Sequence, residues 1–222
     1  MENFRCINVA AAVSNTQPAK EYIKNIFNNN YDGHDYYHSI RVYEIATKIA
    51  IEEKANLFVV QLSALLHDID DRKVLNNPNN DSVRDFLGKN NVPKTIIDDI
   101  CNNINDVSFF GIDSVIPRTL EGKCVQDADR LDAIGAIGIA RAFAFGGSNK
   151  RLIYDPKSEP IYNMNKEIYI KNNSSTINHF YEKLFLIKDM MNTKIGQTMA
   201  LERDYYMRTF LDEFFAEWNC KK

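Results

Sequence analysis

The sequence has few cysteines and no spacing that would pair them. Its four cysteines lie far apart along 222 residues and form no Cys-x-x-Cys pair, which argues against a disulfide framework and against a structural zinc site. No stretch approaches the roughly 18 uncharged apolar residues that a membrane-spanning helix needs. The opening string MENFRCINVAAAV has an early acid and no long apolar core, which is a poor signal peptide. We therefore expect a cytoplasmic protein with no membrane partner.

An excess of positive charge is also missing. The 27 lysines and arginines are outnumbered by 30 acids, for a formal net charge of −3. Broad nucleic-acid binding usually needs a basic face, so we expect no nucleic-acid partner, while a local basic pocket for one small phosphate ligand stays open. Hydrophobic residues at 45% are ordinary for a globular chain, and this length is enough to bury a full core.

The alternation of apolar and polar residues that is typical of strands is absent. Apolar residues recur at helical spacing instead. Val42, Ala46 and Ile49 predict a helix from 38 to about 53. The string LFVVQLSALLH is apolar nearly all round and predicts a helix buried on most sides. The Pro-containing stretch 148–165 predicts a loop. Further helices are predicted at 92–104, from Cys124 to Phe145, and along two late stripes, Phe180, Leu184, Ile187, Met191 and Met207, Leu211, Phe214, Trp218.

Two of the four histidines stand in informative places. His67 and Asp68 end the apolar helix in SALLHDIDD, where burial of polar groups is costly unless they are paired or bound to a metal. The alternative is a helix end with a satisfied histidine and a solvated acidic turn. His38 begins the preceding helix in GHDYYHSIRV, and by itself such a histidine is usually a surface or capping residue.

Three carboxylates fall within six residues of the string VQDADRLDAIGAIGIAR, namely Asp127, Asp129 and Asp132. Their mutual repulsion calls for a compensating cation. On a helix, Asp129 and Asp132 would share a face while Asp127 points elsewhere. The alternative is an acidic helix N-terminus favoured by the helix dipole. That alternative explains acids in general, but it does not explain why they precede such a buried stretch.

The ordered pattern His … His-Asp … Asp resembles the HD superfamily of metal-dependent phosphohydrolases. The strings GHDYYHSIRV, LLHDIDDRK and DADRLDAIGAIGIARAF resemble its small stand-alone branch of nucleotide pyrophosphohydrolases, and STINHFYEKLFLIKDMMNTKIGQTMALERD extends the likeness over nearly the whole chain. The resemblance implies an all-α helical bundle with a metal site between helices. We expect one domain over 1–222, with a motif core at about 34–145 and C-terminal helices at about 174–219 packed on it.

By the resemblance, the metal ligands carry over to His38, His67, Asp68 and Asp129. Asp129 is preferred to Asp127 because the family ligand is the aspartate of an Ala-Asp pair. Two imidazoles and two carboxylates suit Mn²⁺, Fe²⁺, Co²⁺, Ni²⁺ or Mg²⁺, and ligand type does not select among them. We expect one divalent ion, because two-metal members of the family use additional histidines and only His34 and His179 remain. Mn²⁺ is the ion we favour.

Further roles follow from closeness to the motif. Asp71, three residues past Asp68, is expected to accept a proton from the attacking water, and the alternative is a solvated acid after the motif. Asp132 is expected to orient a ligand or to contact substrate, and Asp127 to anchor a helix start. Positive groups must neutralise charge on the phosphoryl oxygens, and for each of them a surface charge or a helix cap is the alternative. The expected substrate-binding residues are Arg41, Lys73, Arg130, His179 and Lys183.

The branch implies attack of water on the α-phosphorus of a nucleoside triphosphate, with release of the monophosphate and pyrophosphate. Two alternatives stay open, which are phosphomonoesterase or phosphodiesterase action on another small phosphorylated metabolite, and a nucleotide-sensing module. The complete ligand set argues against a degenerate sensor, and the acidic charge argues against a nuclease. Base and sugar preference, association as a homodimer, and the roles of His34 and of the 148–165 loop stay open.

Overall fold

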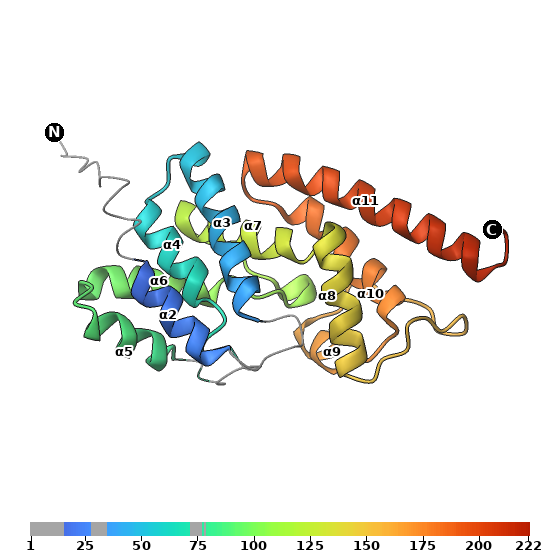
Figure 1. Ribbon diagram of the computed structural model, residues 1–222, viewed down its shortest axis with the longest axis horizontal. Helices are drawn as coiled ribbons and strands as arrows, with labels where there is room; N and C mark the ends of the chain where they lie inside the picture. Colours follow the sequence, from blue (N-terminus) through green and yellow to red (C-terminus); the bar gives the residue numbers. More distant parts are fainter. Residues whose placement is uncertain (1–15, 28–34, 72–76, 78) are drawn as a thin grey trace.

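The computed structural model describes residues 16–27, 35–71, 77 and 79–222, and within them every regular element is a helix (Figure 1). The expected all-α class is therefore confirmed. No helix in the described part of the chain is long and apolar enough to cross a membrane. The elements are α2 (Gln17–Ile26), α3 (Tyr36–Glu53), α4 (Leu57–Leu66), α5 (Asp81–Lys89), α6 (Lys94–Asn105), η1 (Gly111–Asp113), α7 (Leu120–Asp132), α8 (Gly135–Ser148), α9 (Lys166–Lys171), α10 (Thr176–Glu182), η2 (Leu184–Met190) and α11 (Lys194–Trp218).

Helix α4 lies at the centre of the first half of the fold, with α2, α3, α6 and α7 packed around it. Residues 59 to 66 are all buried, as expected for a helix that is apolar on every side. The Asn56 side chain caps its start by accepting from Phe58 and Val59 backbone N–H groups. The other end leads directly into His67 and Asp68, so the packing of α4 sets where that doublet lies.

The acidic segment lies at the end of a helix, which corrects one sequence interpretation. The single helix predicted from Cys124 to Phe145 is two helices, α7 and α8, and α8 continues past the expected stop to Ser148. Gly135 begins α8 with φ +77°, a conformation that glycine adopts at little cost. Thr119 caps the start of α7, so the three aspartates occupy its last turns and the helix N-terminus alternative is wrong.

The late apolar stripe also changes helix type partway. Phe180, Leu184, Ile187 and Met191 are all buried as their spacing predicts. They do not share one helix, however, because α10 ends at Glu182 and the 3₁₀ helix η2 follows after a turn at Lys183 (φ −139°, ψ −57°). The last predicted stripe lies within α11 as expected, and the stretch predicted as a loop at 148–165 is a loop from 149 to 165, since Ser148 still belongs to α8.

Asp127 ties α7 to the start of α11. Its buried carboxylate accepts from the backbone N–H groups of Asn192 (2.8 Å) and Thr193 (2.7 Å). The Asn192 amide and the Thr193 hydroxyl also donate to it, at 2.8 and 2.7 Å. A Cβ at Gly196 would come 2.5 Å from Asp127 Oδ2, so this close approach requires glycine. Asp127 therefore anchors a helix start, as predicted, but the helix is α11 and not its own.

We predict that Asp127→Ala lowers the free energy of unfolding by about 3 kcal/mol, because it leaves two buried donors of Thr193 and two part-buried donors of Asn192 without their charged acceptor. Urea denaturation followed by far-ultraviolet circular dichroism measures the change. Asp99→Ala, at an exposed position on α6, serves as the matched control. A loss no larger in the Asp127 variant than in this control would show that the anchor contributes little.

Candidate metal centre

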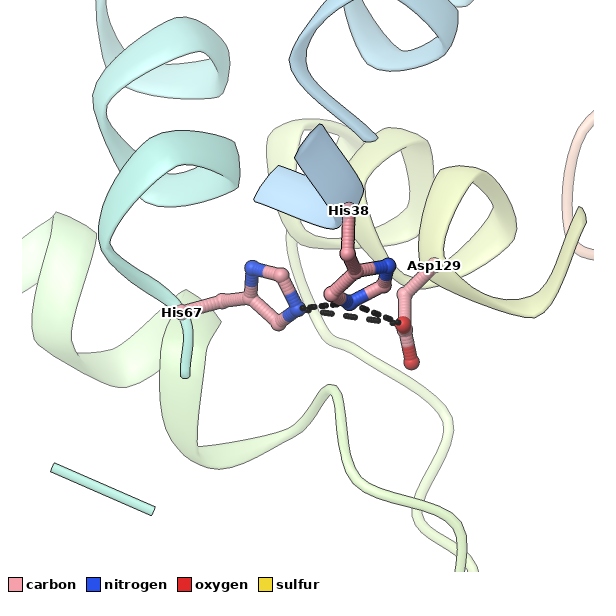
Figure 2. Close-up of side chains that lie close together, drawn as sticks. All are labelled: His38, His67 and Asp129. Atoms are coloured by element: carbon pink, nitrogen blue, oxygen red, sulfur yellow. Dashed lines mark hydrogen bonds and ion pairs between the residues drawn. The ribbon is translucent and has the colours of Figure 1, made fainter. Parts of the chain in front are cut away.

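Side chains from three helices converge on one point (Figure 2). His38 comes from the first turn of α3, where Asp35 caps the helix by accepting from the His38 backbone N–H. His67 follows α4, and Asp129 comes from α7. The Nε2 atoms of His38 and His67 lie 3.3 Å apart. Asp129 Oδ1 lies 3.5 Å from the first and 3.7 Å from the second.

Asp68 completes the group of four side chains that the sequence singled out. Its Oδ2 lies 3.2 Å from His38 Nε2, and its Oδ1 lies 3.3 Å from His67 Nε2. Among the described residues, His38, His67 and Asp129 offer ligand atoms that all lie within 4.8 Å of one another, an arrangement that can hold a metal ion. The donor set of imidazole and carboxylate fits a divalent first-row ion or Mg²⁺.

The outward nitrogen of each imidazole is engaged, which leaves the inward nitrogen for a metal. His67 Nδ1 donates to the Ala64 carbonyl oxygen at 2.9 Å. Because a carbonyl oxygen only accepts, the proton of neutral His67 lies on Nδ1 and the lone pair on Nε2. His38 Nδ1 lies 2.7 Å from Asp132 Oδ2, the carboxylate–histidine contact typical of metal sites. Asp132 therefore has the orienting position that the sequence suggested for it.

Two arginines balance the charge of buried Asp132. Arg41 donates to both of its oxygens, at 2.7 and 3.0 Å, and Arg141 donates at 2.9 Å. Burial would raise the pKa of Asp132, but hydrogen bonds from His38 and Arg41 lower it to about 2. Arg41 was predicted to bind substrate. The structure instead directs its guanidinium to Asp132 and does not place it among the residues lining the cavity described below.

The cluster holds its charges through mutual compensation. Burial by itself would lower the pKa of His67, but the carboxylates of Asp68 and Asp129 outweigh burial and raise that pKa to about 9. For Asp129, burial by itself would raise the pKa. Its hydrogen bond and charge interaction with His67, together with the charge of His38, instead hold the pKa of Asp129 well below the usual range. The two carboxylates thus favour a positive charge at this point, and a bound cation would meet the same attraction.

A cavity of about 570 Å³ opens beside the cluster. His67, Asp68, Asp71 and Asp129 line one part of it. Of the predicted substrate-binding residues, His179 and Lys183 also line it. The sequence analysis missed the lining residues Arg141, Arg151, Phe109 and Tyr169, because they lie outside the motif strings or carry no pattern of their own and only the tertiary fold brings them here.

Two predicted cations are not found at the cavity. Arg130 is buried and donates from Nη1 to the Met190 carbonyl oxygen at 2.5 Å, and it is not among the lining residues. Although it follows Asp129 in sequence, its side chain joins α7 to η2, so the structure corrects its predicted role. Lys73, and His34 with it, lie outside the described residues.

A family model described as HD domain matches residues 35–134, which include all four side chains of the cluster. Over 201 residues the chain is 37% identical to YpgQ of Bacillus subtilis (strain 168). The matched region covers 86% of this chain and 88% of YpgQ. YpgQ has been solved in complex with ADP, and that structure gives 32% identity, coverage of 89% of this chain and 97% of the other, and a TM-score of 0.71.

Two further solved structures are similar over almost the whole chain. An HD-superfamily hydrolase from Bacillus thuringiensis is 36% identical, covers 94% of this chain and 98% of its own, and has a TM-score of 0.72. A protein from Lactobacillus plantarum is also 36% identical, covers 93% of this chain and 98% of its own, and has a TM-score of 0.84. The likeness therefore extends well beyond the motif, to the C-terminal helices.

We predict a graded loss of metal. His67→Ala removes a ligand and should abolish measurable Mn²⁺ binding, whereas Asp132→Asn removes an orienting partner and should weaken it about 10- to 100-fold. Isothermal titration with Mn²⁺ measures both, and circular dichroism checks that the helix content is kept. His179→Ala, a cavity histidine outside the cluster, should bind Mn²⁺ as the unmodified protein does. Unchanged affinity in His67→Ala would remove this residue from the ligand set.

Proposed function

The chain belongs to the HD domain family of metal-dependent phosphohydrolases, and on that premise we propose that it hydrolyses nucleoside triphosphates to nucleoside monophosphates and pyrophosphate. The observation that carries the proposal is the opening of the His–Asp cluster into a cavity lined by cations. Its volume of about 570 Å³ suits a ligand of nucleotide size. The complex of the relative YpgQ with ADP supports a nucleotide as the ligand class.

In this proposal His38, His67, Asp68 and Asp129 hold one divalent ion, for which Mn²⁺ is the first choice. The ion would supply polarisation of a phosphoryl oxygen and a lowered pKa for water. Asp132 keeps the His38 ring in place through their 2.7 Å contact. The packing of α11 on α7 and α8 supports one functional domain over 1–222, with the motif core at about 34–145 and the helices at about 174–219 packed on it.

Asp71 is the proposed acceptor of the proton from the attacking water. It lines the cavity beside Asp68, and its backbone N–H donates to the Asp68 carbonyl oxygen at 3.3 Å. The water oxygen forms a bond to the α-phosphorus while the bond to the α,β-bridging oxygen breaks. That oxygen leaves with its electron pair as part of pyrophosphate, and the water proton passes to the Asp71 carboxylate.

The direct test is a product assay. Metal-stripped protein receives Mn²⁺ and a panel of nucleoside triphosphates, and pyrophosphate and phosphate are measured separately. We expect Mn²⁺-dependent pyrophosphate with an equal amount of the nucleoside monophosphate, and no activity in Asp129→Ala. Release of inorganic phosphate alone would identify a phosphatase instead, and no product from any member of the panel would refute the proposal.

Asp71→Asn should lower kcat by about 10²–10⁴-fold and leave the Mn²⁺ affinity within a few-fold of the original, since this residue is not a proposed ligand. Steady-state kinetics and metal titration on the same preparation separate the two effects. Asp99→Asn, exposed on α6, is the matched control and should behave like the unmodified protein. Loss of metal with intact turnover per bound ion would contradict the assigned role.

A further inference from the structure

The cavity has two chemically different ends. The acids that line it are Asp68, Asp71 and Asp129. Asp68 and Asp129 belong to the His–Asp cluster, and Asp71 lies close to it in sequence. Lys183 and Arg151 line it as well, and neither forms an ion pair with a carboxylate of the described residues. Lys183 directly follows α10, and Arg151 hydrogen-bonds to Asn172 and Asn173 between α9 and α10, whereas the cluster lies where α3, α7 and the end of α4 meet. One end is therefore acidic and the other carries unbalanced positive charge.

Aromatic rings hold the Lys183 ammonium at the basic end. Its Nζ lies 5.1 Å from the ring centroid of Phe109 and 5.8 Å from that of Tyr169. The two rings meet edge to face, with centroids 5.1 Å apart. Such contacts attract an ammonium group without neutralising it. Lys183 is thus positioned with its full charge available to a ligand.

Arg151 is positioned by neutral groups. Its Nη2 donates to the Asn172 carbonyl oxygen at 2.8 Å and its Nε to Asn173 Oδ1 at 3.3 Å. The guanidinium also lies over the Phe145 ring, 5.4 Å from its centroid. Asn172 is fixed in turn, because its amide donates to the buried Glu182 carboxylate at 2.7 Å. This part of the wall is preorganised, and its cation keeps its charge.

We propose that Lys183 and Arg151 form an anion subsite that binds the β- and γ-phosphates of the substrate. This inference rests on the proposed function, in which the α-phosphoryl group lies at the metal cluster. When the α-phosphorus–oxygen bond breaks, the bridging oxygen and its electron pair leave with pyrophosphate, so negative charge grows on the group that the two cations face. Fixed cations at such a place stabilise the transition state.

Binding of inorganic pyrophosphate to the metal-stripped protein in the presence of a chelator tests the subsite apart from catalysis. Isothermal titration should show affinity about 10-fold or more weaker in Lys183→Met, and separately in Arg151→Met, because each removes a charge-assisted contact. The matched control is Lys166→Met. The Lys166 ammonium lies 4.1 Å from the Phe110 centroid, the same kind of contact, yet Lys166 does not line the cavity.

Adenosine is the second probe, and its affinity should be the same in Lys183→Met as in the unmodified protein. A variant that loses adenosine but keeps pyrophosphate would show that this end takes the base, and would overturn the proposal. Pyrophosphate binding that is undetectable in the unmodified protein, or unchanged in both variants, would overturn it too. Thermal melting of each variant confirms that the fold is kept.

Kinetics with Mn²⁺ separate this inference from the function on which it rests. We expect kcat/KM for pyrophosphate release from a nucleoside triphosphate to fall about 10-fold or more in Lys183→Met, with Mn²⁺ affinity unchanged. If the unmodified protein binds pyrophosphate through Lys183 but releases none from any triphosphate, the subsite stands and the proposed function fails. If it releases pyrophosphate and Lys183→Met does so equally well, the subsite fails and the function stands.

Discussion

The contact between His38 Nδ1 and Asp132 Oδ2, at 2.7 Å, is the interaction on which the site depends. It turns the His38 ring so that Nε2 faces His67 and Asp129. A buried carboxylate is tolerated only when it is paired, and two arginines from α3 and α8 supply that pairing. Asp132 on α7 therefore orients His38 on α3 and joins α3, α7 and α8 beside the His–Asp cluster.

Helix α7 carries a second function on its other face. Asp129 and Asp132 face the cluster, and Asp127 faces away and accepts from the residues that begin α11. The anchor fixes the chain at the end of η2, and η2 packs against α10, whose end leads into Lys183. Residues 127–132 thus serve both ends of the cavity. Asp129 lines its acidic end, and Asp127 anchors the start of α11 next to η2, which packs against the helix that precedes Lys183.

Sequence patterns predicted what local chemistry determines and missed what tertiary packing determines. The buried helix before His67 was identifiable from its apolar run, whereas the four clustered side chains were assigned as a set by the resemblance to the HD superfamily. The breaks at Gly135 and Lys183 were not identifiable, since hydrophobic spacing continues through both. Arg130 adjoins Asp129 in sequence, but on a helix the next side chain points about 100° away, so adjacency misled. Arg151 has no nearby motif, and only its contacts with the α9–α10 link bring it to the cavity.

The distribution of charge within the cavity bears on which phosphates it favours. One metal ion held by the four His and Asp side chains would accept any phosphoryl group. These side chains alone therefore give no reason to prefer a triphosphate over a monoester. Lys183 and Arg151 change this, because a monoester bound at the cluster would leave both cations in a partly enclosed cavity without a counter-charge. A triphosphate tail that reaches them replaces the water around each cation with phosphate oxygens, which attract it more strongly in such surroundings. Under the proposed function, a preference for a long phosphate chain would then come from the two cations that line the cavity beside the cluster.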